Sequence, residues 1–482
     1  MDSKNNKINL TLYFIFIILI IFQAVHGVIG FKYNCYNLDP SIYLQAIARA
    51  GHNLDFFPFS TVRGHHIFMD HIDPIILPVG VLLRLFSINV FSLSIFEWMM
   101  ALVIPFIIAL KAQNKFDSTL EKIFILSLVI FSKGILDAIH FPIHPTTWAI
   151  TGIFFFLWAM ERSNFWHIIA GTLFLSSFKE IFPIAIFLSG LYGIFIQKNI
   201  KVGISISSIS AIFIFVFLKK AELFEFSSTI DFYVHDRLQV GTLMSLTKLK
   251  NRFNDLSFWK EVFKVTIPYL IPLALVIRKD KKILKSSSFH HSMIMFASMF
   301  GIHVFSKSIG YHYSITIVAP LIFFLMNNFN LNASDHKKSI IFCIILLFIT
   351  SMGRHTRAIA RPFKSTESAC THDKTKELEI TKLQKIIKGF DTKDKHILST
   401  GGVLPRLITA NANYYQTKSY SKKQNSYDLL ILEQYGQSRL WKVSKSDLNK
   451  AWNICKKDEI ILDGNHFLVI KSPSKNCFSL VN

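Results

Sequence analysis

The feature that most constrains the fold of this chain is a series of long runs with almost no charged residue. A helix needs roughly 17 to 25 apolar residues to cross a bilayer, and backbone polar groups in lipid must be paired within their own segment. The clearest runs cover residues 9–30, 94–110, 146–160, 181–196, 201–218, 289–305, 311–327 and 339–352. Weaker runs at 74–90, 121–136, 164–178 and 263–278 would bring the spans to about eleven or twelve. The sequence therefore predicts a mainly α, polytopic transmembrane helical bundle.

Loop charges predict the orientation of this bundle, because short Lys- and Arg-rich loops usually face the cytoplasm. Such loops lie at residues 197–201, 278–282 and 335–338. The N-terminus, with Lys4 and Lys7, also starts inside, and the apolar run that follows is too long for a signal peptide, so we expect a retained helix. The loops at 31–73 and 219–262 and the C-terminal domain are then extracytoplasmic, in a protein of the cytoplasmic membrane.

Residues 74–145 fit this orientation only with one adjustment. Two full spans between 74 and 110, followed by one at 121–136, would place His144 inside, whereas the neighbouring loops place it outside. One of these segments is therefore expected to be re-entrant or too short to cross.

After residue 353 the spans stop, so we divide the chain into a membrane domain, 1–353, and a small soluble α/β domain, 354–482. In the second domain the pattern predicts a helix, two strands, a helix and a hairpin. These elements cover residues 375–389, 396–400, 427–432, 445–454 and 459–471. Cys455 and Cys477 flank the hairpin and could form a disulfide if the domain faces an oxidising compartment.

Basic charge is concentrated in that domain. The chain has a net charge of +22, and residues 354–482, with 23 Lys and Arg against 12 Asp and Glu, contribute half of it. A basic domain beside a membrane favours membrane lipid or a phosphorylated lipid carrier as its partner, rather than nucleic acid. A plain solvated surface would show the same excess.

Polar residues gather at the predicted membrane boundaries, where ionisable groups are costly and often functional. They are Asp39 with Gln45; Arg63, His65, His66, Asp70, His71 and Asp73; Asp137, His140 and His144; Lys179 with Glu180; and His312 with Tyr313. The predicted orientation places nearly all of them at the outer boundary, where they could converge on one cleft. Each group also has a plainer interpretation, such as a turn, solvated histidines, a loop ion pair or an aromatic belt.

These residue types suit sugar transfer from a lipid phosphate. Such a site needs a carboxylate to accept the proton of the acceptor, and positive groups to neutralise the leaving phosphate. Asp39 or Asp70 could be the base, and Arg63 and Lys179 could face the phosphate. A divalent metal ion could share that role, with Asp39, Asp70 and His71 as candidate ligands, although their spacing matches no recognised metal motif.

Several short motifs occur in a specific order along most of the chain. They are Leu38-Asp39-Pro40-Ser41-Ile42-Tyr43-Leu44-Gln45, Phe59-Ser60-Thr61-Val62-Arg63-Gly64, Asp70-His71-Ile72-Asp73-Pro74, His144-Pro145, Lys179-Glu180, His312-Tyr313, Ile397-Leu398-Ser399-Thr400 and Tyr427-Asp428-Leu429-Leu430. Together they resemble the domain-of-unknown-function 2079 family of predicted membrane proteins. That family is grouped with the GT-C glycosyltransferases, multi-span enzymes that use lipid-phosphate sugars.

The resemblance implies a GT-C-like fold and an acidic catalytic residue in the first outer loop, where Asp39 fits best. The positions predicted to bind substrate are Gln45, Arg63, His144, Lys179, Glu180, His312 and Tyr313. Three positions depart from the family pattern: Asp73 stands in place of Ser, Ile143 in place of Phe, and Ile181 in place of a second acid. These departures weaken the metal hypothesis more than the family assignment.

The leading hypothesis is an integral membrane glycosyltransferase of GT-C type that uses a polyprenyl-phosphate-linked sugar donor on the outer face of the membrane. Asp39, Asp70 and His71 are its predicted catalytic residues. The alternative is a transporter or lipid-handling protein without covalent chemistry, which would place polar residues near the middle of its spans. Here they lie at helix ends and in the first loop, which favours chemistry at the surface.

Overall fold

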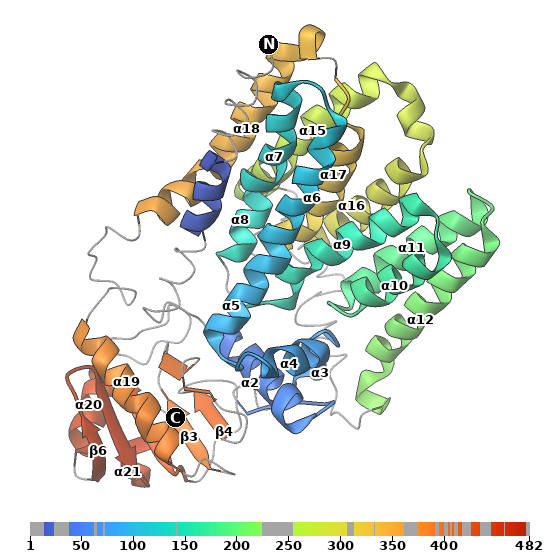
Figure 1. The fold of residues 1–482 in the computed structure, drawn as a ribbon. Helices are drawn as coiled ribbons and strands as arrows, with labels where there is room; N and C mark the ends of the chain where they lie inside the picture. The colour runs from blue at the N-terminus through green and yellow to red at the C-terminus, as the bar shows by residue number, and fades with distance from the viewer. Residues whose placement is uncertain are drawn as a thin grey trace. The chain divides into compact units, whose positions relative to one another are not determined.

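The computed structural model describes sixteen stretches of the chain. They are residues 14–23, 38–61, 65–70, 73–140, 143–223, 254–305, 313–331, 333–360, 374–390, 395–399, 403–404, 407–408, 413–416, 426–433, 445–456 and 458–478. The chain divides into two compact units, and Figure 1 shows their elements. The first unit consists of Met1–His26, Met69–Ile75 and Phe96–Ala360, and the second of Gly27–Phe68, Ile76–Ile95 and Arg361–Asn482. The chain is mostly helical with a small sheet, as predicted.

The first unit is a helical bundle, to which α5 belongs from Phe96 onward. The helices are α5 (Val90–Trp98), η1 (Met99–Val103), α6 (Ile104–Ala112), η2 (Gln113–Lys115), α7 (Thr119–Ile130), α8 (Lys133–Ile139), α9 (Pro145–Arg162), α10 (Phe165–Ser176), α11 (Ile181–Phe195), α12 (Ile200–Leu223), α15 (Leu256–Lys279), η4 (Lys281–Lys285), α16 (Ser287–Phe305), α17 (Ser314–Asn328) and α18 (Ala333–Ala360). Every residue of α17 from Ser314 to Met326 is buried, and the helix packs against α8, α9, α15 and α16. The core of the bundle therefore surrounds α17.

Apolar helices follow the predicted runs. In the described part of the chain, three helices are long and apolar enough to cross a membrane: Val90–Lys115, Ile200–Lys219 and His336–Thr356. Shorter apolar helices cover Phe14–Gln23, Phe165–Ser176, Ile181–Phe195 and Ser314–Asn328. The total number of spans remains a prediction, and most of the predicted loop 219–262 lies outside the described residues.

The weak run at 74–90 contains a short helix, α4 (Ile76–Arg84), whose 9 residues extend about 14 Å at the rise of an α-helix, less than half of a hydrocarbon core of roughly 30 Å. The next helix, Val90–Lys115, has the length of a full span. In the run at 121–136, α7 has only 12 residues, so which of these segments does not cross stays a prediction.

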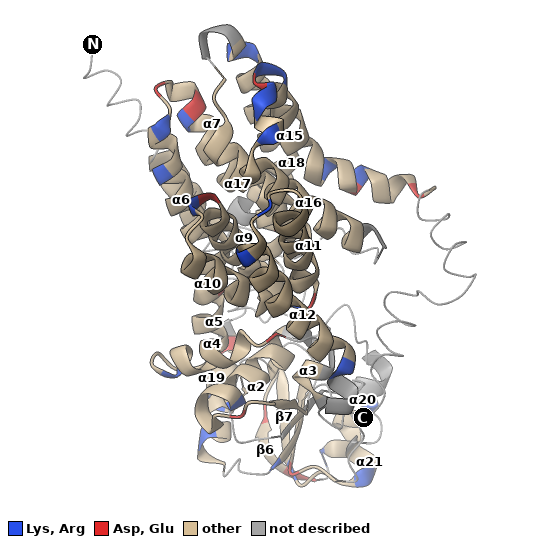
Figure 2. Ribbon diagram, turned by 90° about the vertical axis from the view of Figure 1, so that its right-hand side faces the viewer, with Lys and Arg blue, Asp and Glu red and all other residues tan. Residues whose placement is uncertain are grey.

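Hydrogen bonds join several loops at one end of the bundle. Lys115 Nζ donates to Asn327 Oδ1 over 2.7 Å, which joins the α6–α7 connection to the last turn of α17. Gln197 Nε2 donates to Ser287 Oγ over 2.6 Å, and Lys279 Nζ donates to a carbonyl just before α18. We call this end the basic end, because its loops and helix ends carry Lys111, Lys115, Arg162, Lys198, Lys201, Arg278, Lys279, Lys281, Lys282 and Lys285. Figure 2 shows such basic residues near α6, α7 and α15.

The N-terminal part of the second unit packs α2 against α4. It contains α2 (Leu38–Asn53), α4 and the antiparallel strands β1 (Phe59–Ser60) and β2 (His65–His66), and α3 (Ile67–Asp70) follows at its border. The two helices touch at glycines, because a Cβ atom on Gly80 would lie 2.6 Å from the carbonyl oxygen of Ile47 and 2.8 Å from the nitrogen of Gly51. Only glycine at this position permits such close packing.

The C-terminal part of the second unit is the predicted α/β domain. Its elements are α19 (Lys374–Gly389), β3 (His396–Ser399), β4 (Asn413–Gln416), β5 (Leu429–Glu433), α20 (Lys445–Cys455), β6 (Glu459–Asp463), β7 (Phe467–Lys471) and α21 (Lys475–Phe478). The sheet order is β4-β3-β5-β7-β6, in which β3 runs parallel to β4 and β5, and β7 runs antiparallel to β5 and β6. Each predicted helix and strand is present, β4 is additional, and a disulfide joins Cys455 to Cys477.

Candidate functional site

Lys179 lies in the short connection between α10 and α11, and its side chain is only 2% exposed. Its Nζ lies 4.9 Å from the ring centroid of Tyr313, the residue before α17. Within the part of the chain that the structure describes, this ammonium has no hydrogen-bond acceptor. Burial of an unpaired ammonium costs several kcal/mol, and a cation–π contact contributes only about 0.5–2 kcal/mol. The position is therefore suited to binding an anion.

His144 and Glu97 lie next to this position. Glu97 Oε2 accepts hydrogen bonds from the backbone N–H of His144 over 3.1 Å and from Trp148 Nε1 over 3.3 Å. His144 begins α9, where its Nδ1 accepts from the backbone N–H of Thr146, and its ring lies 6.3 Å from the ring of Tyr313. Glu97 is 1% exposed. The Glu97 side chain therefore fixes the start of α9, where His144 faces Tyr313.

Tyr313 joins these side chains. Its ring lies 5.0 Å from the ring of His303, whose Nε2 is hydrogen-bonded to Thr316 Oγ1 at 2.8 Å. Thr316 in turn donates to the carbonyl of Tyr313 over 2.9 Å. We call Glu97, His144, Lys179, His303 and Tyr313 the Lys179 cluster. The structure thus brings together His144, Lys179 and Tyr313, which the sequence placed in three separate motifs.

Two further acidic residues are buried, one next to Lys179 in the sequence and one on a segment that pairs with its turn. The N–H of Ile75 donates to the carbonyl of Ser177 over 2.9 Å, which pairs the segment before α4 with the turn that carries Lys179. Asp73, on that segment, is 0% exposed, and Glu180, next to Lys179, is 7% exposed. Both are buried acids, so the surroundings of the Lys179 turn are polar in spite of their burial.

Asp137 is held by two cations. Its side chain is 2% exposed, Arg354 Nε donates to it over 2.5 Å, and Lys133 Nζ donates to its other oxygen. Lys133 also lies 3.5 Å from Glu261, which pairs with Lys264. Partial burial acts to raise the pKa of Glu261, but Lys264 and Lys133 outweigh it and hold that pKa below its usual value. Asp137 therefore ties α8 to α18 as a fully paired carboxylate.

Gln45 lies in the second unit and is fully buried on α2. Its Nε2 donates to Thr61 Oγ1 over 2.7 Å, and its Oε1 accepts from Ser60 Oγ over 3.2 Å. Thr61 then donates to the carbonyl of Tyr414 in β4 over 2.7 Å. The amide of Gln45 therefore connects α2 and the β1 region to the C-terminal sheet.

The other predicted site residues are described only in part. Asp39 is the second residue of α2 and Asp70 the last of α3, but their side chains lie outside the described set. Arg63, His71 and His312 lie outside the described residues. Among the residues that the structure describes, no group of three or more His, Cys, Asp or Glu could hold a metal ion. The metal hypothesis, whose candidate ligands are Asp39, Asp70 and His71, therefore stays a prediction.

Glu97 and His303 are the members of the cluster that sequence reasoning missed. Both lie inside apolar runs, at 94–110 and 289–305, in which a single polar residue leaves the hydropathy almost unchanged. The signal that could have found them is the residue type itself, because an ionisable side chain within a span usually faces the bundle interior.

Comparison with solved structures places this architecture beside one known protein. The fold is similar to that of ArnT from Cupriavidus metallidurans, in a crystal structure bound to undecaprenyl phosphate. The TM-score is 0.50 with 10% sequence identity, and the similarity covers 96% of this chain and 99% of that chain. At this identity the likeness concerns the fold. No family model and no curated protein matches the sequence, so the resemblance to the domain-of-unknown-function 2079 family stays a prediction.

Proposed function

We propose that this protein is a membrane glycosyltransferase of GT-C type that transfers a sugar from a polyprenyl-phosphate-linked donor. The similarity of its whole fold to ArnT, a GT-C glycosyltransferase bound to undecaprenyl phosphate, supports the class of protein and the class of lipid. The helices that are long and apolar enough to cross a membrane support its position in the bilayer.

The observation that carries the proposal is the buried ammonium of Lys179. A lipid phosphate would supply the charged hydrogen-bond acceptor that this ammonium lacks among the described residues. The ring of Tyr313 under Lys179 holds the side chain in position for that contact. In the transfer reaction the same ammonium would stabilise the phosphate as it leaves the sugar.

The remaining roles follow the chemistry of the reaction. Asp39 is the proposed base, which accepts the proton of the acceptor hydroxyl as the new glycosidic bond forms and the bond to phosphate breaks. Asp70 and His71 are proposed to support it, directly or through a divalent metal ion. The buried amide of Gln45, on the same helix as Asp39, is proposed to hold that helix in place.

Further substrate contacts are proposed from the motifs and the cluster. Arg63 and His312 are proposed as additional contacts to the phosphate. His144, Glu180 and Tyr313, which belong to the Lys179 cluster or adjoin it, are proposed to line the donor site.

We also propose that the basic end faces the cytoplasm and the C-terminal domain faces outward. The Lys and Arg residues at the loops of the basic end support this orientation. The disulfide between Cys455 and Cys477 supports an oxidising compartment for the C-terminal domain. The start of α9 and the Lys179 turn lie at the ends of their helices away from the basic end, so the donor site would face outward as well.

The test is transfer of labelled sugar from a panel of polyprenyl-phosphate sugars by the purified protein in lipid discs. Lys179→Gln should lower kcat/KM by about 10²–10³-fold, the range seen when one charge-stabilising group is removed. Lys201→Gln is the matched control, because Lys201 also stacks on an aromatic ring, 4.6 Å from the ring centroid of Phe165, but is exposed. Wild-type protein that transfers sugar from none of the donors would contradict the proposal.

A further inference from the structure

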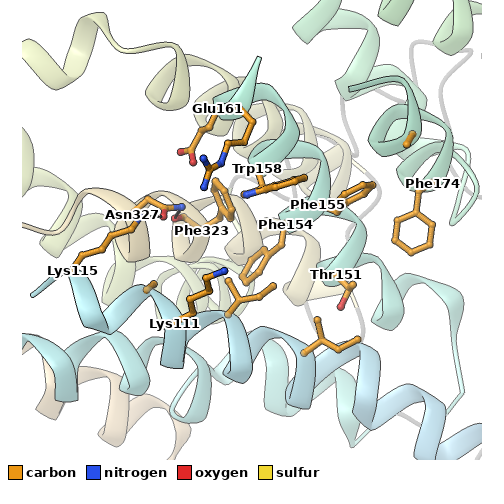
Figure 3. A pocket seen from close by; sticks show the side chains of 15 residues that line it. Lys111, Lys115, Thr151, Phe154, Phe155, Trp158, Glu161, Phe174, Phe323 and Asn327 are labelled. Atoms are coloured by element: carbon orange, nitrogen blue, oxygen red, sulfur yellow. Dashed lines mark hydrogen bonds between the residues drawn. The ribbon is translucent and has the colours of Figure 1, made fainter. Parts of the chain in front are cut away.

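A large cavity opens in the first unit between α6, α9, α10 and α17. Its volume is about 1050 Å³, and Figure 3 shows the side chains that surround it. The lining residues come from these four helices and from η2, all within one compact unit. The lining combines charged and polar side chains with a set of aromatic ones.

The polar part lies at the basic end of the bundle. Lys111, Lys115 and Arg162 line it together with Glu161 and Asn327. Lys115 donates to Asn327, and the carboxylate of Glu161 accepts a hydrogen bond from Ser288 over 2.5 Å. Three basic side chains and one acidic side chain line this part of the cavity, so it attracts negative charge.

The deeper part is aromatic. Phe154, Phe155, Trp158 and Phe174 line it, and Phe323 closes it from α17. Figure 3 shows Lys111 reaching from α6 toward the aromatic side chains of α9. A ligand that fills the whole cavity would therefore need an anionic head and an apolar body.

The depth of the cavity matches one leaflet of a bilayer. Along α9 the lining runs from Thr151 to Arg162 at the end of the helix, a rise of about 16 Å at 1.5 Å per residue. Half of a hydrocarbon core of roughly 30 Å is about 15 Å. A lipid whose phosphate lies at Arg162 would thus place its chain along the aromatic wall as far as the middle of the membrane.

From this arrangement we propose that the cavity binds an anionic phospholipid of the leaflet at the basic end. Lys111, Lys115 and Arg162 contact its phosphate, and the aromatic wall holds one acyl chain. Basic pockets between membrane helices are recognised sites for anionic headgroups. The cavity is distinct from the proposed donor site, because His144 and Arg162 lie at opposite ends of α9, about 26 Å apart along the helix. The inference requires the bundle to lie in a membrane, but it does not require sugar transfer.

The test is native mass spectrometry of the purified, delipidated full chain after addition of phosphatidylglycerol or phosphatidylcholine. We expect preferential retention of phosphatidylglycerol by the wild type. The double variant Lys111→Gln/Lys115→Gln should bind phosphatidylglycerol roughly 30-fold more weakly, because two cations near the phosphate are lost. Ala170→Phe, which fills the cavity from α10 without a change of charge, should lower retention of both lipids.

The control is Lys281→Gln/Lys282→Gln, which removes two exposed lysines of η4 at the same end of the bundle but outside the cavity. This variant should retain phosphatidylglycerol like the wild type. Equal retention by the cavity variants and the wild type would overturn the proposal. Displacement of phosphatidylglycerol by an equal concentration of undecaprenyl phosphate would also overturn it, because the cavity would then belong to the lipid carrier. Sugar transfer is measured separately, so failure here leaves the proposed donor site unaffected.

Discussion

Lys179 and Glu97 are both buried ionisable residues of the bundle, and their hydrogen bonding differs. Glu97 accepts hydrogen bonds from the backbone of His144 and from Trp148, whereas the ammonium of Lys179 lies over the ring of Tyr313 and has no hydrogen-bond acceptor among the described residues. A protein stabilises a buried charge by pairing it, so an unpaired one is a sign of a site that a ligand completes. The asymmetry between these two residues is the reason that the phosphate is assigned to Lys179.

Asp137 is the opposite case, a buried carboxylate whose partners are complete. Asp137→Asn removes the carboxylate that pairs with Arg354 and Lys133, and loss of one partner of a buried ion pair typically costs about 3–5 kcal/mol. We expect a lower midpoint of thermal unfolding in detergent. An unchanged midpoint would contradict the view that this ion pair holds α8 to α18.

Glu261→Gln provides the comparison for Asp137, because its carboxylate is 43% exposed. Removal of an exposed pair should change the free energy of unfolding by less than about 1 kcal/mol. The pKa of Glu261 is lowered in the folded state, so its small contribution is present above its ordinary pKa and is lost as the pH falls through the lowered value. In the Glu261→Gln variant that loss on acidification should be absent from the unfolding curves.

At the scale of elements, the contact between α2 and α4 positions the helix that carries the proposed base. Gly80→Ala would place a Cβ against the backbone of Ile47 and Gly51, and overpacking of this kind typically costs about 1–3 kcal/mol. We expect a destabilised protein with reduced sugar transfer, measured together in lipid discs. Gly353→Ala in α18 is the matched control, because its added Cβ would meet nothing within 4 Å. Equal behaviour of the two variants would mean that this contact does not position α2.

The elements also show what the sequence could and could not predict. The helices at 375–389 and 445–454 and the hairpin at 459–471 were predicted because their periodicity is local. Strand β4 was missed because its sequence, Asn413 to Gln416, lacks an apolar alternation and is defined by its parallel pairing with β3. The run that contains α4 was ambiguous because it is apolar enough for a span, whereas α4 itself has only 9 residues.

In the candidate site, the sequence could predict individual residues from their type and motif, but not the contacts between them. The motifs identified Lys179, His144 and Tyr313 as candidates. Their proximity in the fold depends on the packing of α9, α11 and α17, which no local pattern encodes. Gln45 was predicted as a substrate contact, a role that remains untested. Its hydrogen bonds to Ser60 and Thr61 became visible only in the fold.

At the scale of the whole molecule, the orientation in the membrane can be tested by cysteine labelling. In a variant without Cys35, Cys343 and Cys370, a cysteine at Glu459→Cys should react with an impermeant maleimide in intact cells, because the C-terminal domain is proposed to face outward. A cysteine at Lys282→Cys, in the basic end, should react only after permeabilisation. The reverse pattern would contradict the proposed orientation.

The central claim is that this protein performs chemistry on a polyprenyl-phosphate sugar and does not only bind the lipid. The most direct measurement compares Asp39→Asn with the wild type in lipid discs, following both carrier binding and transfer of labelled sugar. The account predicts that the variant binds undecaprenyl phosphate like the wild type while transfer is lost, because the base is removed and the phosphate contact at Lys179 is not. Full transfer by Asp39→Asn would contradict the assigned base, and carrier binding by the wild type without transfer from any donor would contradict the enzyme itself.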